Sequence, residues 1–335
     1  MGEFSHVGIT GAAGFIGSHL SRRLLDDGVF VSAADDLSFG SLANLGPCLD
    51  HPRFRLKVTD CSRMANLQPI FGECDAIVHL AARKIPRYGG ACATLQTNVA
   101  SAEAACTIAL AEHALLVFAS TSDVYGNAPV PLSEDGPLVL GPSTTRRWSY
   151  AASKLYGEHL ALAMAAECGL AVTILRLFGS YGPHNHRSWW GGPQAAFIEA
   201  LLDGRPMEIH GDGQQVRSFT YVTDVVDAIV RALRCEAARG QLINIGAEEA
   251  VTILELARRV QTLMGLTPPI RSRFISYAEF AGSYEDVRSR IPDTRKARAL
   301  LGFEACVPLS EGLRHTIAWH RQQRIPVQRP AHVGP

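Results

Sequence analysis

Tyr150 and Lys154 are the residues of this sequence whose types and spacing are best suited to acid–base chemistry. Four positions along a helix place the phenol and the ammonium on the same face. A free tyrosine titrates at about pH 10, so a tyrosine that acts as a base near neutrality needs its pKa lowered by roughly three units. A nearby ammonium contributes to that shift because it stabilises the phenolate. Tyrosine and lysine in this spacing are more often surface neighbours. The residues around them must therefore show whether the pair is catalytic.

Those residues include a polar run at the end of a predicted strand. An apolar segment at 115–120 leads directly into Thr121, Ser122 and Asp123. Ligands of open α/β sheets bind at the carboxyl ends of the strands. Hydroxyl and carboxylate groups in this place therefore favour a catalytic role for Tyr150.

A second candidate site is a glycine loop near residue 10. Gly11, Gly14 and Gly17 stand between an apolar segment and a helical pattern, which is typical of a phosphate-binding loop. The first glycine allows a sharp exit from the strand, the second lets the backbone approach a pyrophosphate, and the third lets the helix lie close to the sheet. Asp35 ends the next apolar segment, where a carboxylate can accept both hydroxyls of an adenine ribose and repel a 2′-phosphate. The pattern predicts NAD rather than NADP, against the simpler interpretation of a glycine turn and a surface aspartate.

Composition narrows the class of protein. The chain has 335 residues, of which 47% are hydrophobic and 19% are charged, and its formal net charge is zero. Such a chain can bury a large core, and no overall field draws it to nucleic acid or to an anionic membrane. Its eight cysteines form no CxxC pair, so we expect reduced thiols and a cytoplasmic protein. We see no signal-peptide pattern, and no segment approaches the roughly 18 apolar residues of a membrane span.

The elements that must position these residues follow from the hydrophobic pattern. Short apolar segments alternate with amphipathic helical patterns through the first half of the chain, which is the rhythm of βαβ units. Parallel strands buried on both faces are continuous apolar runs, so the pattern predicts a doubly wound parallel α/β sheet. The expected strands are 7–10, 30–34, 54–58, 76–80, 115–120 and 171–177, and the expected helices are 18–25, 95–113 and 150–167.

The composition changes after residue 182, because proline, glycine and tryptophan cluster in 182–193. We therefore expect a dinucleotide-binding domain at 1–182, with segments near 218–245 returning to it. Residues 183–325 would form a smaller α/β lobe for the substrate. The tail at 326–335 has three prolines and no periodicity, which predicts disorder.

Further motifs extend along nearly the whole chain. They are Asp60, His79-Leu80-Ala81-Ala82, Asn98, Thr121-x-x-Val124-Tyr125-Gly126, Arg176-x-Phe178-x-x-Tyr181-Gly182-Pro183, Gly211-Asp212-Gly213-x-Gln215-x-Arg217 and Arg290-x-Pro292-Asp293. Together with the glycine loop and the Tyr150–Lys154 pair, they resemble the extended short-chain dehydrogenase/reductase family, in its nucleotide-sugar epimerase, dehydratase and decarboxylase branch. The resemblance implies a Rossmann fold, NAD as the cofactor and a nucleotide-diphosphate sugar as the substrate.

The resemblance also implies a role for each matching residue. Tyr150 would be the acid/base, Lys154 its electrostatic partner and a ribose ligand, and Thr121 a hydrogen-bond partner of the reacting sugar oxygen, with Asp123 beside it. The implied cofactor contacts are Gly11, Gly14, Phe15, Ile16, Gly17, Asp35, Asp60, Cys61, Leu80, Ala81, Ala82, Lys84, Asn98, Tyr150 and Lys154. The implied substrate contacts are Lys84, Ser122, Arg176, Gly179, Phe197, Arg217 and Arg290, with Arg288 as a rival to Arg290.

Two regions depart from the family pattern. Many relatives carry asparagine where this chain has Gly179 and aspartate where it has Ser218, which leaves one diphosphate contact open. The insert at 184–193 is both polar and aromatic, as a lid over a sugar or base would be. His184-x-His186 has no carboxylate or cysteine nearby to complete a metal site, so we expect no metal. Trp189 and Trp190, which follow in the insert, could equally be core residues.

The residues after Thr121 bear on the reaction. All three branches begin by oxidising a sugar carbon to give a 4-keto sugar. A 4,6-dehydratase would carry Asp-Glu where this chain has Ser122-Asp123, and a uronate decarboxylase would carry Ser-Glu. An epimerase needs no third acid, so the sequence favours a 4-epimerase, with a decarboxylase or a dehydratase as alternatives. A scaffold or sensor that binds NAD without turnover is an alternative of another class.

The two long helices expected at 95–113 and 150–167 are rich in alanine and leucine. Their apolar faces exceed what one face of a sheet would cover, and in relatives such helices pair as a four-helix bundle. We therefore expect a homodimer.

Overall fold

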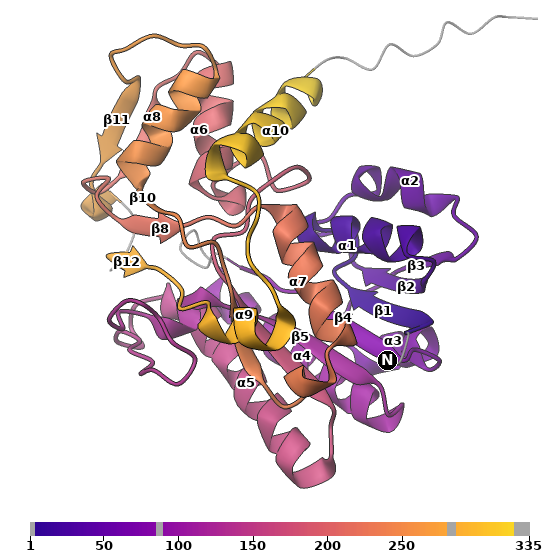
Figure 1. Ribbon diagram of the computed structural model, residues 1–335. Helices are drawn as coiled ribbons and strands as arrows, with labels where there is room; N and C mark the ends of the chain where they lie inside the picture. Colours follow the sequence, from indigo (N-terminus) through magenta and orange to yellow (C-terminus); the bar gives the residue numbers. More distant parts are fainter. Residues whose placement is uncertain (1–3, 85–89, 280–285, 325–335) are drawn as a thin grey trace, which may run out of the picture.

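The computed structural model describes residues 4–84, 90–279 and 286–324 (Figure 1). Its centre is a seven-stranded sheet in the order β3-β2-β1-β4-β5-β6-β9, in which every neighbouring pair is parallel. The strands are β1 (His6–Thr10), β2 (Phe30–Asp35), β3 (Phe54–Val58), β4 (Ala76–His79), β5 (Leu115–Thr121), β6 (Val172–Leu177) and β9 (Leu242–Ile245). The doubly wound parallel sheet predicted from the sequence is confirmed.

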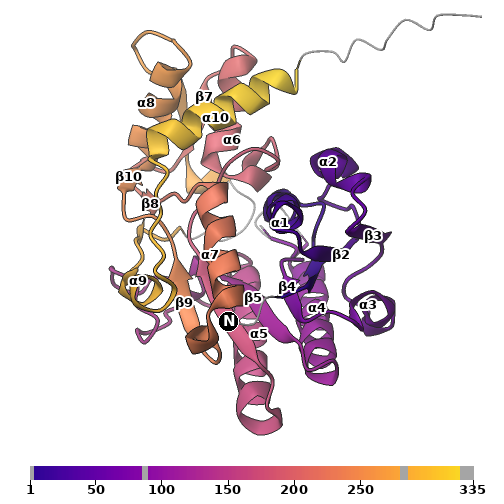
Figure 2. The ribbon, with the colours of Figure 1, turned by 45° about the vertical axis from the view of Figure 1, so that its right-hand side comes forward.

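Helices cover both faces of this sheet, because alternate strand residues point to opposite sides and most of them are apolar. Val31 and Val117 belong to one core cluster, whereas Leu116 and Ile174 belong to the other. In Figure 2, α1 lies above the strands, and α3 and α4 lie below them. The helices of the first side are α1 (Phe15–Asp26), α2 (Gly46–Leu49) and α7 (Val222–Arg234), and those of the second are α3 (Met64–Phe71), α4 (Ala91–Ala111) and α5 (Trp148–Cys168).

The helices begin earlier than the hydrophobic pattern alone indicates. Helix α1 starts at Phe15 rather than at 18, so Gly17 lies in its first turn. Its leading N–H groups therefore point at the space beside the glycine loop, where they lack intrahelical partners. Helix α5 starts at Trp148, which places Tyr150 in its first turn.

A second lobe, in the upper left of Figure 1, contains three helices and two small sheets. The helices are α6 (Pro193–Leu202), α8 (Ile253–Leu263) and α10 (Leu309–Gln322). One sheet pairs β7 (Met207–His210) with β11 (Ser272–Ile275), and the other has β8 (Val216–Ser218) between β10 (Ala250–Thr252) and β12 (Ser289–Arg290).

The chain crosses between the two parts more than once. After β8 it returns through α7 to β9, which pairs with β6 at the edge of the central sheet, and α9 (Arg295–Leu301) packs against β9. The tail expected to be disordered, at 326–335, lies outside the described residues. None of the described helices has the combination of length and apolar character that a membrane span requires.

Candidate active site

A cavity of about 560 Å³ lies between the carboxyl edge of the central sheet and the second lobe. The glycine loop, the ends of β2 and β5, the start of α5 and the insert at 184–193 all contribute to its lining. A cavity of this size at the carboxyl ends of parallel strands is the expected place for a nucleotide ligand.

The glycine loop is shaped by close contacts within the chain. Gly11 has φ +73°, and a Cβ there would come within 2.8 Å of the backbone nitrogen of Ala81. A Cβ on Gly17 would collide with the carbonyl oxygen of Gly11. Gly14 has more room, since its Cβ would meet only that same oxygen, at 3.2 Å. Gly11 and Gly17 are therefore required by the fold, and Gly14 leaves the cavity open for a pyrophosphate.

Asp35 is fixed beside this loop at the end of β2. Its two carboxylate oxygens accept hydrogen bonds from the backbone nitrogens of Ala13, at 2.9 Å, and Leu37, at 2.8 Å. Burial raises the pKa of this carboxyl, although these backbone donors oppose the shift. A buried carboxylate held beside a phosphate cradle matches the ribose end of NAD, so the residues present fit this cofactor.

The other predicted cofactor residues divide into two groups. Phe15, Ile16, Asp60, Cys61, Leu80, Ala81, Ala82 and Lys84 line the cavity. Asn98 does not line it, because its side chain is used inside the protein: the amide bonds both backbone groups of Arg83, at 2.7 and 3.0 Å, and donates to Ser153 Oγ at 2.9 Å. Asn98 therefore positions the loop after β4 and joins it to α5.

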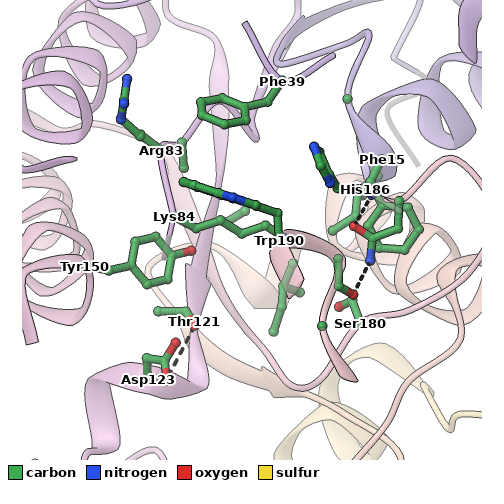
Figure 3. Close-up of a pocket in the computed structure, with 18 of the residues that line it drawn as sticks. Phe15, Phe39, Arg83, Lys84, Thr121, Asp123, Tyr150, Ser180, His186 and Trp190 are labelled. Carbon is green, nitrogen blue, oxygen red and sulfur yellow. Dashed lines mark hydrogen bonds between the residues drawn. The ribbon is translucent and has the colours of Figure 1, made fainter. Parts of the chain in front are cut away.

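Thr121, Tyr150 and Lys154 all line the cavity, as the sequence predicts for a catalytic group. In Figure 3, the Tyr150 phenol and the Thr121 side chain lie on the same side of the cavity, close to Lys84. Lys154 Nζ donates to the carbonyl oxygen of Ala119 at 2.8 Å, which anchors the ammonium to β5. Burial lowers the pKa of Lys154 to about 8, although Glu158 opposes the shift.

The pKa of Tyr150 is raised above its ordinary value, contrary to the lowering that a base requires. Burial is the main cause and the negative charge of Asp123 adds to it, whereas a hydrogen bond with Thr121 acts in the opposite direction. The chain alone therefore holds a neutral phenol. The lowering that the sequence predicts from Lys154 is not found.

An ion-pair cluster at the substrate end of the cavity was only partly predicted. Arg147 bridges Asp286, at 3.0 Å, and Asp123, at 3.4 Å. Arg217 pairs with Asp286 at 3.0 Å, and Arg290 pairs with Asp123. Among the described residues, three guanidinium groups thus face these two carboxylates, and guanidinium groups at this end of the cavity suit a diphosphate.

The pKa shifts in this cluster show that its charged side chains interact strongly with one another. Burial alone would raise the pKa of Asp286, but Arg217, Arg147 and Arg290 hold it well below its usual range. Burial, with Arg290, lowers the pKa of Arg217 to about 10, so this guanidinium stays protonated at neutral pH. Sequence reasoning missed Arg147 and Asp286. Arg147 lies three positions before Tyr150, which is the one signal that could have identified it.

Three predicted substrate contacts lie away from the cavity. Arg176 is buried in a bidentate pair with Glu158, at 2.9 and 2.6 Å, and its guanidinium stacks on the Tyr125 ring. Phe197 is fully buried on α6. Arg288 is exposed and forms an ion pair with Asp212 at 2.8 Å. Of the two rival arginines, Arg290 is the one that lines the cavity.

The remaining predicted contacts, Lys84, Ser122, Gly179, Arg217 and Arg290, do line the cavity. Gly179 has φ +46°, and a Cβ there would collide with the carbonyl oxygen of Ser218. The backbone at this position therefore has no room for the asparagine of many relatives.

The aromatic residues of the insert line the cavity too. Trp189 stacks on His210 at a ring distance of 4.0 Å, and Trp190 packs on Phe39. Gln194 and Gln215 also line the cavity, and the buried atoms Gln194 Nε2 and Gln215 Oε1 have no hydrogen-bond partner among the residues that the structure describes.

Near the glycine loop, the insert is held against α1 by contacts of His184. His184 bonds Ser18 Oγ at 3.0 Å and stacks on His19. Within the described ranges, no group of three or more His, Cys, Asp or Glu side chains has metal-binding geometry.

Comparisons with known proteins identify the family of the chain. The NAD dependent epimerase/dehydratase family matches residues 7–246. The chain is 33% identical to a UDP-N-acetyl-alpha-D-glucosaminuronate decarboxylase of Bacillus cytotoxicus, over 94% of this chain and 97% of the relative. It is also 33% identical to a dTDP-glucose 4,6-dehydratase of Streptomyces griseus, over 96% and 95% of the two chains.

Among solved structures, a UDP-glucuronic acid 4-epimerase from Bacillus cereus in complex with NAD has a TM-score of 0.82 and 27% identity, and the match covers 95% of this chain and 99% of the other. These relatives include a decarboxylase and a dehydratase at 33% identity and an epimerase at 27% identity. The chain therefore belongs to the NAD-dependent epimerase/dehydratase family, within the extended short-chain dehydrogenases/reductases.

Proposed function

We propose that the protein interconverts the C4 epimers of a nucleotide-diphosphate sugar through a 4-keto sugar, with Tyr150 as the acid/base. The observation that supports this best is the state of the acidic groups near Thr121 and Tyr150. Asp123 and Asp286 are both held in ion pairs with arginine. An ionised, paired carboxylate is a poor proton donor, and an epimerase needs no third acid.

When bound, NAD supplies a hydride acceptor at C4 and the positive charge that lowers the pKa of a neighbouring phenol. Tyr150 exchanges a proton with the C4 oxygen in both directions, and Thr121 hydrogen-bonds the same oxygen. Lys154, anchored by Ala119, keeps a positive charge beside the phenol below about pH 8. The guanidinium groups of the arginine cluster bind the diphosphate.

A uronate decarboxylase is the second candidate, and one observation favours it. Arg147 and Arg290 meet beside Thr121, where they could receive a sugar carboxylate in place of Asp123. A 4-keto uronate is a β-keto acid, so it can lose carbon dioxide without an additional base. The relatives of the chain include uronate decarboxylases at 33–34% identity.

The deciding experiment is incubation of the purified protein with UDP-, dTDP-, GDP- and CDP-linked hexoses and uronates, followed by NMR and by measurement of carbon dioxide. We expect an equilibrium mixture of two C4 epimers. Stoichiometric carbon dioxide from a uronate would establish the decarboxylase instead. If no sugar nucleotide gives a product or reduced nicotinamide, the chain is a binding protein without turnover.

We also propose a homodimer formed through α4 and α5. These two long helices lie side by side on the same face of the sheet, and each presents a large exposed apolar side chain, Leu95 and Tyr156. Light scattering should give twice the chain mass of 36.2 kDa at micromolar concentration. A constant mass of one chain would contradict the proposal.

A further inference from the structure

Phe39 and Trp190 meet across the cavity from opposite sides. Phe39 lies in the loop after β2, and Trp190 lies in the short 3₁₀ helix Trp189–Gly191 of the insert. Their ring centroids are 5.1 Å apart at an interplanar angle of 32°, and the Arg83 guanidinium lies 5.6 Å from the Phe39 ring centroid. All three side chains line the cavity. Figure 3 shows Trp190 between Phe39 and Lys84, so its indole reaches into the middle of the cavity.

Each ring is fixed to a different part of the molecule. The Phe39 loop packs tightly on the glycine loop, because a Cβ on Gly40 would come within 2.9 Å of Asp35 Oδ1 and 2.8 Å of the Ala13 backbone. The Trp190 turn is held by Ser188, whose hydroxyl accepts a hydrogen bond from the Trp190 backbone at 3.3 Å. The contact therefore joins the dinucleotide half to the substrate lobe.

The exposure of Phe39 needs a physical reason. This large apolar side chain is 44% exposed, although burying it in the core would be favourable. Its loop instead presents it to Trp190 and Arg83, next to the carboxylate that marks the ribose end of the cofactor site. The contacts of the Phe39 ring with a second aromatic ring and with a cation contribute favourable free energy. This contribution offsets part of the cost of leaving the side chain exposed.

We propose that Phe39 and Trp190 form an aromatic bridge over the cavity that retains NAD between turnovers and must open for the cofactor to leave. The proposal rests on the chemistry proposed above, because an enzyme that returns the hydride to its own substrate never needs to release NAD. Arg83 supports the bridge from one side, and Asn98, which holds the Arg83 backbone, ties it to α5 through Ser153. Phe39 and Trp190 are positioning residues in this scheme and do not take part in proton transfer.

The test is the rate at which NAD leaves the purified protein. Phe39→Ala, Trp190→Ala and the double variant should each release NAD about tenfold faster than the wild type, as measured by transfer to an excess of an NAD-consuming dehydrogenase. The double variant should be no faster than either single variant, because either substitution breaks the same contact. Leu42→Ala, which truncates an exposed apolar side chain of the neighbouring segment outside the cavity, is the matched control.

Phe39→Tyr and Trp190→Phe keep an aromatic pair and should release NAD nearly as slowly as the wild type. These conservative variants give a second test if an alanine variant fails to fold. Release at the wild-type rate from the folded double variant would overturn the bridge, and so would effects of the two single variants that simply add. Failure of the proposed function has a different signature, since the protein would retain NAD yet convert no sugar nucleotide.

Discussion

The two ends of the cavity are built in different ways. At the cofactor end, the glycine loop and Asp35 come from neighbouring strands, and backbone groups do most of the positioning. At the substrate end, Arg147, Arg217 and Asp286 come from distant parts of the chain and hold one another through side-chain ion pairs. Local steric requirements leave a recognisable spacing in the sequence. A charge cluster assembled by folding does not, so the two ends should respond differently to substitution.

The largest expected effect is at Tyr150, where the two ends meet. Tyr150→Phe should lower kcat by at least about a hundredfold, because general acid–base catalysis is typically worth that much. NAD content and the unfolding transition should change little. Tyr156→Phe, on the same helix but outside the cavity, is the control. Retention of more than about a third of the wild-type rate would show that Tyr150 is not the acid/base.

The cofactor end of the cavity can be disrupted by a substitution that displaces its backbone. Gly17→Ala places a Cβ against the Gly11 carbonyl and should destabilise the protein by about 1–3 kcal/mol, as overpacking does. The loop must shift, so the purified variant should contain little NAD, measured by chromatography after heat denaturation. Gly46→Ala has open space around its Cβ and should keep both properties. Full NAD content in Gly17→Ala would mean that this close contact does not shape the cradle.

Asp123 tests the substrate end. If the protein is an epimerase, Asp123 orients the sugar and the arginines, so Asp123→Asn should slow turnover by no more than about tenfold. Asp212→Asn, in an exposed ion pair, should have no effect. If a decarboxylase or dehydratase needs the carboxylate, Asp123→Asn should instead accumulate a 4-keto intermediate and reduced nicotinamide. That accumulation would refute the epimerase assignment.

The smallest effect concerns the contact between the insert and α1. Burial, with His19 and Arg22, lowers the pKa of His184 to about 4, below its ordinary value of 6.5. The unfolded chain therefore binds more protons between these two values, and the free energy of unfolding should fall as the pH drops below about 6.5. Tm measured from pH 7 to pH 5 should decline less steeply in His184→Asn than in the wild type. An identical decline, with exposed His159→Asn as the control, would exclude His184 as a source of this pH dependence.

The sequence predicted the central sheet well, because strands buried on both faces are continuous apolar runs. Its helix starts were late by two to four residues: the first turns of α1 and α5 contain polar or glycine residues that face the cavity, which breaks the apolar periodicity. Arg176 was assigned to the substrate because it belongs to a motif. The structure pairs it with Glu158 of α5, a partnership that no spacing reveals.

The sequence by itself determined the parallel sheet, the glycine loop with Asp35, and the Tyr150–Lys154 pair, since each depends on contacts within a few residues or on the period of one element. Only the tertiary structure decided that Arg147 and Asp286 join Arg217, that Arg290 rather than Arg288 faces the cavity, and that Trp190 meets Phe39. The physical reason is that ion pairs and ring contacts have short range in space but no fixed separation along the chain. Their partners become neighbours only when the second lobe packs over the sheet.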